Sequence, residues 1–299
     1  MTAGQPEGQT FAGESLLLRY VNFVKLPHTV FALPFAFLGV VYASFATTIT
    51  LQQVVLVLVA FTAARFAAMG FNRIVDRRYD ARNPRTMHRE LPAGRLSLTQ
   101  AVVSVVAACG VFVAAAALLN PLCLALSPLA LAWILFYSFT KRLTPLSHLW
   151  LGLGLGIAPG AGYLAVTGVW SEPWWTLPVI ALAVLTWVGG FDIFYALPDE
   201  SFDREHGLKS AVVLLGQRQA ILLAKLLHGV TVGALVGFGL GTPFGAVYYA
   251  GVVVAAVLLA WEHQLVRPGD LSRLDAAFFR LNGIVSIVVL LFALGDRLI

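Results

Sequence analysis

Charged residues and cysteines are both scarce in this sequence. Only 12% of its 299 residues are Asp, Glu, Lys or Arg, whereas soluble domains carry roughly 25%. Both cysteines, Cys109 and Cys123, fall inside apolar segments, which argues against a disulfide framework and against a zinc site. The polar first 15 residues have no basic stretch ahead of a short apolar core, so they do not resemble a cleavable signal peptide. An ordinary soluble domain and a disulfide-rich scaffold are therefore excluded.

Apolar residues dominate what is present. They make up 59% of the chain, and the mean hydropathy is +0.83. Apolar runs recur at about the 20-residue length that a membrane-spanning helix needs. Because each helix satisfies its own backbone groups in lipid, we predict an all-α polytopic membrane protein that forms a single domain over residues 1–299. The nine predicted transmembrane helices are 29–46, 52–71, 99–119, 121–139, 149–168, 175–197, 219–240, 243–266 and 276–295.

Basic residues are distributed unevenly between the loops. No lysine or arginine occurs in the loops at 47–51, 120, 169–174 and 241–242. On the other side, seven arginines lie between residues 73 and 95, and most of them belong to one loop. Because cytoplasmic loops are enriched in Lys and Arg, we predict a multi-pass plasma (inner) membrane protein with a cytoplasmic N-terminus and an outside C-terminus. This topology explains the net charge of +5 without a nucleic-acid partner. The bilayer is the expected partner, and no obligate protein partner is indicated.

A row of oxygen-bearing side chains ends the second predicted helix. Asn72, Asp76 and Asp80 are spaced at i, i+4 and i+8, which places them on one helical face about 6 Å apart at each step. Acidic residues contribute little to topology, and carboxylates beside the membrane are costly to desolvate. We therefore predict a functional role for this row.

A second acidic cluster ends the sixth predicted helix. Asp192, Tyr195, Asp199 and Asp203 follow one another in steps of 3, 4 and 4 residues, which would place them on one helical face. Pro198 interrupts this pattern because proline removes a backbone donor and bends or ends a helix. We therefore predict a break in the helix just before Asp199.

The two acidic clusters match in spacing. Asp199 and Asp203 each follow an aspartate of the first row by 123 residues. This spacing predicts a pseudo-repeat, roughly 20–140 and 145–266, followed by the ninth helix. Because ligand sites in membrane folds commonly lie between repeats, we expect the two clusters to face one shared cavity.

Paired carboxylates of this kind suit Mg²⁺, which prefers one or two carboxylates together with substrate phosphates and water. A diphosphate group joined to a membrane-buried tail is typical of a prenyl diphosphate. Metal binding would stabilise the leaving diphosphate, and a nucleophile would capture the resulting allylic cation. Six basic residues are candidates to contact phosphate oxygens: Arg77, Arg78, Arg82, Lys141, Arg142 and Lys209.

One arginine lies inside the second predicted helix. Arg65 precedes Asn72 by seven residues and shares its helical face. An intramembrane arginine is a candidate for function. Two interpretations stay open: contact with substrate, or a buried pairing with Asp192 or a backbone carbonyl.

Glycines recur every fourth residue in two predicted helices. One series runs from Gly152 to Gly160, and the other runs from Gly229 to Gly241. Small residues at this spacing allow helix backbones to approach closely. We therefore expect both series to pack against neighbouring helices.

Several segments together resemble one known family. The row from Asn72 to Asp80 resembles a first Asp-rich motif, and Asp199-Glu-Ser-Phe-Asp203 resembles a second. Residues 137–142, Tyr-Ser-Phe-Thr-Lys-Arg, are similar to a Tyr-x-x-x-Lys-Arg segment, and Asn-Pro-Arg-Thr at 83–86 also fits. On these motifs the chain resembles the UbiA superfamily of intramembrane aromatic prenyltransferases over nearly its whole length. Pro198 and the glutamate that follows Asp199 depart from the commonest second motif.

The resemblance implies nine transmembrane helices around a central cavity that opens laterally to lipid, with cytoplasmic Asp-rich caps. Two Mg²⁺ ions would bridge the diphosphate there. The expected catalytic and metal-binding residues are Asp76, Asp80, Asp199 and Asp203, with Asn72 as a further metal ligand. Arg142 and Arg77 are candidates for diphosphate or acceptor contact by analogy, and Asp199 for orienting or deprotonating the acceptor. The full predicted substrate-binding set is Arg65, Arg77, Tyr137, Lys141, Arg142, Asp192, Tyr195 and Lys209.

The expected reaction is transfer of a polyprenyl group from prenyl diphosphate to an aromatic acid of the 4-hydroxybenzoate type in quinone biosynthesis. A dihydroxynaphthoate acceptor for menaquinone is the alternative. Haem- or chlorophyll-directed members of the superfamily are less similar. An ion-coupled secondary transporter, a non-enzyme alternative, would place carboxylates in the centres of its helices, whereas these lie at helix ends. A CDP-alcohol phosphotransferase would carry an Asp-Gly-x-x-Ala-Arg element, which does not occur here.

Overall fold

The computed structural model describes residues 11, 13, 15–25, 29–269, 271, 273, 274 and 281–299, and leaves the side chains of 29–31 undescribed. Apart from an isolated bridge residue, Arg267, all the regular structure in these residues is helical. The helices are α1 (Leu16–Phe23), α2 (Thr29–Ala43), α3 (Leu51–Asp80), α4 (Leu98–Leu119), α5 (Pro121–Leu143), α6 (Ser147–Thr167), α7 (Thr176–Ala196), η2 (Leu197–Asp199), α8 (Glu200–Glu205), α9 (Ala211–Leu215), α10 (Gln217–Leu240), α11 (Ala246–Leu265) and α12 (Asn282–Leu298).

Each predicted transmembrane helix coincides with a helix of the structure. Within the described residues, seven helical segments are long and apolar enough to cross a membrane: α3, α4, α5, α6, α10, α11, and α7 taken together with η2 and α8. The apolar part of α2, Ala32–Ala43, is shorter, and α12 has 17 residues. The start predicted for the last helix lies outside the described residues. The all-helical membrane fold is confirmed, and the count of nine stays a prediction.

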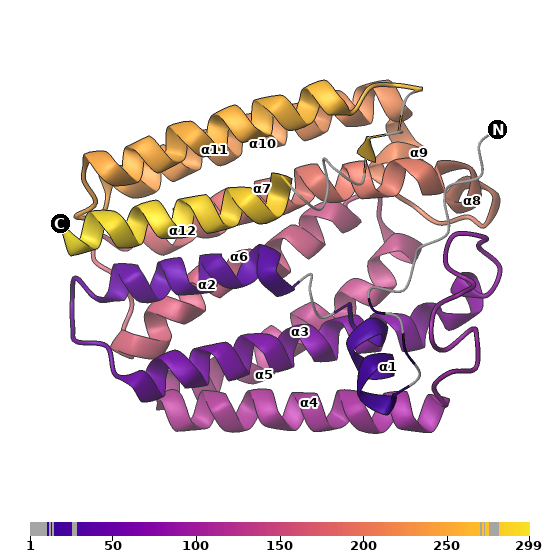
Figure 1. Ribbon diagram of the computed structural model, residues 1–299, viewed down its shortest axis with the longest axis horizontal. Coiled ribbons are helices and arrows are strands. Elements are labelled where there is room, and N and C mark those ends of the chain that lie inside the picture. Colours follow the sequence, from indigo (N-terminus) through magenta and orange to yellow (C-terminus); the bar gives the residue numbers. More distant parts are fainter. Residues whose placement is uncertain are drawn as a thin grey trace.

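The long helices lie side by side, with α3, α4 and α5 on one side of the molecule and α10, α11 and α12 on the other (Figure 1). Helix α6 packs against α2, α5 and α7, and α7 packs against α10, so these central helices join the two sides. The short helices α8 and α9 lie at one end of the bundle, and the C-terminus lies at the opposite end (Figure 1).

Local capping signals fix where the helices begin. Thr50 and Gln53 form a reciprocal capping box at the start of α3, and Ser97 and Gln100 do the same for α4. These pairs satisfy backbone N–H groups that have no partner within the helix. At the end of α7 the helix tightens into η2 at Leu197–Asp199, around Pro198. The predicted break before Asp199 is therefore confirmed.

Each glycine series packs only in part, since a Cβ atom on Gly160 of α6 would meet no described atom within 4 Å and one on Gly237 of α10 would lie 3.5 Å from Val179. A Cβ atom on Gly152 would lie 2.3 Å from the Leu185 carbonyl oxygen of α7, so this glycine permits close α6–α7 contact. On α10, by contrast, a Cβ on Gly229 or Gly233 would meet no described atom within 4 Å. The expectation that the α10 series packs was therefore wrong for these glycines, because they lie on a face that no described helix covers.

Candidate active site

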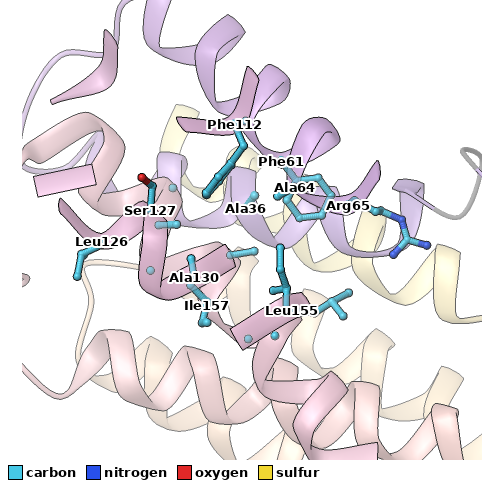
Figure 2. Close-up of a pocket in the computed structure, with 18 of the residues that line it drawn as sticks. Ala36, Phe61, Ala64, Arg65, Phe112, Leu126, Ser127, Ala130, Leu155 and Ile157 are labelled. Atoms are coloured by element: carbon cyan, nitrogen blue, oxygen red, sulfur yellow. The ribbon is translucent and has the colours of Figure 1, made fainter. Parts of the chain in front are cut away.

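An apolar cavity of about 400 Å³ lies among α3, α4, α5 and α6. Figure 2 shows Phe61 and Phe112 on one side of it and Leu155 and Ile157 on another, with the guanidinium of Arg65 at its edge. On α3 the lining runs from Val57 to Asn72, a length of about 22 Å at 1.5 Å per helical residue. Its lining includes Asn72 of the first acidic row, so the cavity meets the polar site at this end.

The first acidic row bonds to side chains from other segments. Asn72 Nδ2 donates to Asp76 Oδ2 at 2.8 Å, and Arg142 Nη2 of α5 donates to Asp76 Oδ1 at 2.6 Å. Asp80 Oδ1 accepts from Arg89 Nη1 at 2.6 Å. Its other oxygen, Oδ2, is buried and accepts no hydrogen bond from the described residues.

The second acidic cluster is bound in the same way. Arg85, in the loop between α3 and α4, donates from Nε to Asp199 Oδ1 at 2.9 Å and from Nη2 to Oδ2. Asn83 Nδ2 also donates to Asp199 Oδ1, at 3.2 Å. Lys141 of α5 donates from Nζ to Asp203 Oδ2 at 3.1 Å. The two Asp-rich motifs are thus joined through α5 and the 81–97 loop.

Each of the four aspartates predicted to be catalytic has a basic partner. The Asp80, Asp199 and Asp203 carboxylates keep only 8%, 9% and 4% of their side-chain surface exposed. Buried charges persist only when they are paired or bind metal, so the basic partners balance the carboxylates in this state. Electrostatic interactions also link the Tyr137 hydroxyl to Asp192, Asp76 and Asp203. The predicted residues on α3, α5, α7 and α8 therefore meet in one site.

Other predicted residues lie differently. Arg77 donates to the Ile74 carbonyl of its own helix, and Lys209 donates from Nζ to the Leu143 carbonyl. Neither bonds to an acidic side chain of the site. Tyr195 lies under Arg85, whose guanidinium carbon is 4.6 Å from the ring centroid.

Arg65 does not pair with Asp192. That carboxylate bonds instead to His148, with 2.6 Å between Oδ2 and the ring Nδ1. Arg65 lines the cavity, and its buried Nε has no hydrogen-bond partner in the part of the chain that the structure describes. The geometry favours the interpretation of Arg65 as a residue that faces substrate.

The predicted site omitted Arg85, Arg89 and His148. Arg85 lies within the Asn-Pro-Arg-Thr segment that supported the family resemblance, and Arg89 follows it by one helical turn's spacing, so a signal existed for both. Positive-inside topology explained both arginines equally well, which hid their role. His148 carried no comparable signal, because nothing in the local sequence connects it to Asp192.

The donor chemistry of the site fits Mg²⁺. The acidic oxygens include the unpartnered Asp80 Oδ2, and Asn72 and Asp76 are already in contact. Among the described residues, no three His, Cys, Asp or Glu side chains gather closely enough to hold a metal by themselves. Mg²⁺ does not need such a cage, since it usually retains water and substrate phosphate as ligands. The residues therefore fit a metal ion that arrives with diphosphate.

Several known proteins are similar to this chain in sequence or in fold. The 4-hydroxybenzoate octaprenyltransferase of Alkalilimnicola ehrlichii is 32% identical over 240 residues, which is 80% of each protein. The apo structure of a UbiA homologue from Aeropyrum pernix superposes with a TM-score of 0.83 at 34% identity, covering 91% of this chain and 98% of that one. A UbiA homologue from Archaeoglobus fulgidus bound to DMAPP and Mg²⁺ shares the fold, with a TM-score of 0.71 at 19% identity and coverages of 94% and 99%.

The model of the UbiA prenyltransferase family matches residues 32–284. This range contains both Asp-rich motifs and all the residues that line the cavity. The chain is an enzyme, a prenyltransferase, and it belongs to the UbiA prenyltransferase family.

Proposed function

We propose that this protein transfers a polyprenyl group from prenyl diphosphate to an aromatic acid of the 4-hydroxybenzoate type, in a Mg²⁺-dependent reaction of quinone biosynthesis. One observation carries the proposal: a site of paired acidic and basic side chains adjoins an apolar cavity that Arg65 lines. The names of the curated relatives support this acceptor class.

Asn72, Asp76, Asp80, Asp199 and Asp203 would hold the metal–diphosphate group. Bound Mg²⁺ supplies positive charge that stabilises the leaving diphosphate. Arg142, Lys141, Arg85 and Arg89 are near enough to these carboxylates to bond with them. With a metal ion held by the carboxylates, these side chains would be available as donors for phosphate oxygens.

The apolar cavity holds the prenyl tail. Its lining of Ala, Leu, Phe and Gly residues excludes water, which would otherwise capture the allylic cation. Tyr137, with Asn72, lies where the cavity meets the polar site. Carbon 1 of the donor is therefore held between the diphosphate site and the cavity.

Arg65 holds the carboxylate of the acceptor. Its guanidinium lies at the cavity edge and its Nε lacks a hydrogen-bond partner. A guanidinium binds carboxylate through two parallel hydrogen bonds. An acceptor fixed in this way presents its hydroxyl-bearing ring toward the donor.

The same arrangement accepts a dihydroxynaphthoate, which also carries an aromatic carboxylate, and this is the second candidate acceptor. The acidic site is proposed to face the cytoplasm, because the loop between α3 and α4 carries most of the clustered arginines. This orientation gives the aromatic acid and the diphosphate group of the donor access from the cytoplasmic side.

The proposal is tested with membranes that contain the protein, Mg²⁺, a prenyl diphosphate and either acceptor. We expect a prenylated acid with 4-hydroxybenzoate, strongly reduced product in Asp199→Asn, and no product when Mg²⁺ is chelated. Glu200→Gln is the matched control, because Glu200 bonds to the exposed Arg204 rather than to the site. Product from neither acceptor with the unmodified protein would refute the proposal.

A further inference from the structure

Asp192 differs from the other aspartates of the site in its partner. The four aspartates of the two Asp-rich motifs bond to Arg or Lys side chains. Asp192 bonds instead to His148, at the first turn of α6, with 2.6 Å between Oδ2 and Nδ1. His148 keeps 2% of its side-chain surface exposed. A buried imidazole is thus the partner of Asp192, whereas an Arg or Lys side chain is the partner of each of the other four aspartates.

The second nitrogen of the ring fixes the protonation state of His148. The backbone N–H of Ala211, the first residue of α9, donates to His148 Nε2 at 3.3 Å. An N–H group can only donate, so Nε2 carries the lone pair and the proton is on Nδ1. A doubly protonated ring would place two N–H groups against each other. His148 is therefore neutral and donates to Asp192, which accepts as a carboxylate.

One oxygen of this carboxylate remains free. Oδ2 accepts from His148, whereas Oδ1 accepts no hydrogen bond from any described residue, and the Asp192 side chain keeps 12% of its surface accessible. Electrostatic interactions connect Asp192 with Tyr137, which lines the cavity, and with Lys141. The Asp192 carboxylate is thus held at one oxygen, keeps part of its surface accessible, and interacts with Tyr137, a residue that lines the cavity.

Aromatic prenylation requires a group that takes a proton. A ring carbon forms a bond to carbon 1 of the prenyl chain while the bond from carbon 1 to the diphosphate oxygen breaks and its electron pair leaves with the diphosphate. The ring then recovers its aromaticity when the C–H electron pair returns to it, and that hydrogen leaves as a proton. The four cation-paired aspartates are committed to charge balance and metal binding. Among the described aspartates of the site, Asp192 is the one that has no Arg or Lys partner and keeps an oxygen without a hydrogen bond.

We propose that Asp192 is the proton acceptor of prenyl transfer and that His148 is the positioning residue that aims its free oxygen. The inference rests on the function proposed above. Positioned general bases typically contribute 10²- to 10⁴-fold to rate. The hydrogen bond from Nδ1 fixes the carboxylate in orientation and in ionised form, while the Ala211 N–H prevents the ring from taking the proton itself.

Two substitutions of His148 separate this role from packing. In His148→Asn the side-chain amide N–H reaches about as far as Nδ1 and keeps the donation to Asp192. In His148→Gln the amide oxygen reaches about as far as Nε2 and keeps the bond from Ala211 instead. We expect His148→Asn to retain kcat within a few-fold, and His148→Gln and Asp192→Asn to lose about 100-fold in kcat. The KM for prenyl diphosphate should not change, because the cation-paired aspartates are intact.

An isotope effect provides a readout that a structural role would not change. With an acceptor deuterated at both ring carbons next to the hydroxyl, proton removal becomes slow enough in His148→Gln for kcat to fall on deuteration. Thermal unfolding in detergent checks that each variant is folded.

The outcomes separate the two proposals. If the unmodified protein prenylates an acceptor but Asp192→Asn matches it in kcat, or if folded His148→Gln shows no isotope effect, only the proton-acceptor inference fails. Equal losses in folded His148→Asn and His148→Gln would also overturn it. If the unmodified protein prenylates neither acceptor, the proposed function fails and the inference fails with it.

Discussion

Arg85 binds Asp199 with two sides of its guanidinium, from Nε to Oδ1 at 2.9 Å and from Nη2 to Oδ2. This bond joins the loop after the first Asp-rich motif to the beginning of the second. A bidentate pair of this kind depends on the planar fork of arginine, which lysine lacks.

Arg85→Lys should therefore impair the site although it keeps the charge. We expect kcat/KM for prenyl diphosphate to fall about 10- to 100-fold, which corresponds to the loss of one or two charge-assisted hydrogen bonds. Steady-state kinetics with varied donor concentration measure this. Arg204→Lys is the control, because Arg204 forms an exposed i,i+4 pair with Glu200 that contributes little. Equal kinetics for the two variants would contradict the role of Arg85.

Arg89→Ala should make the stability of the protein dependent on Mg²⁺. The substitution removes the bond from Arg89 to Oδ1 of the buried Asp80 carboxylate, whose Oδ2 already has no partner among the described residues. Breaking a buried ion pair in this way typically costs about 3–5 kcal/mol of folding free energy. A metal that binds the folded state restores part of this loss. Melting temperatures in detergent with Mg²⁺–diphosphate and with chelator should therefore differ more in Arg89→Ala than in the unmodified protein. The double variant Arg89→Ala/Asp80→Asn should be less sensitive to chelation.

Arg65→Gln should weaken binding of the acceptor selectively. The guanidinium lies at the cavity edge, and loss of a charged hydrogen-bond partner costs about 1.5–3 kcal/mol. We expect the KM for the aromatic acid to rise about 10- to 100-fold, while the KM for the prenyl donor stays the same. Lys225→Gln, at an exposed position on α10, controls for loss of one positive charge. A rise confined to the donor KM would contradict this assignment.

Gly160→Phe should shorten the prenyl chain that the enzyme prefers. Gly160 lines the cavity, and a Cβ there would meet no described atom within 4 Å, so a large side chain can enter the space that the tail is proposed to occupy. We expect competition between donors of different length to shift toward the shorter donor. Gly233→Phe, on the uncovered face of α10, should leave the preference unchanged.

Gly152→Ala should destabilise the contact between α6 and α7. The added Cβ would lie 2.3 Å from the Leu185 carbonyl oxygen, so the two backbones must separate. Overpacking of this kind typically costs about 1–3 kcal/mol. The melting temperature should fall, whereas Gly233→Ala, which meets nothing within 4 Å, should not lower it. Equal melting temperatures for the two variants would show that the helices separate without cost.

The sequence alone determined which segments form long apolar helices and where the carboxylates lie along them. Hydropathy and the i, i+4 spacing of Asn72, Asp76 and Asp80 are local properties, and Pro198 acts on the backbone beside it. Each could therefore be interpreted without knowing which distant residues it contacts. The tertiary structure alone decided which cation binds which aspartate, that His148 holds Asp192, and that Gly152 packs while Gly233 does not. Those relationships join residues far apart in the chain, and they depend on how the helices are placed against one another, which no local pattern specifies.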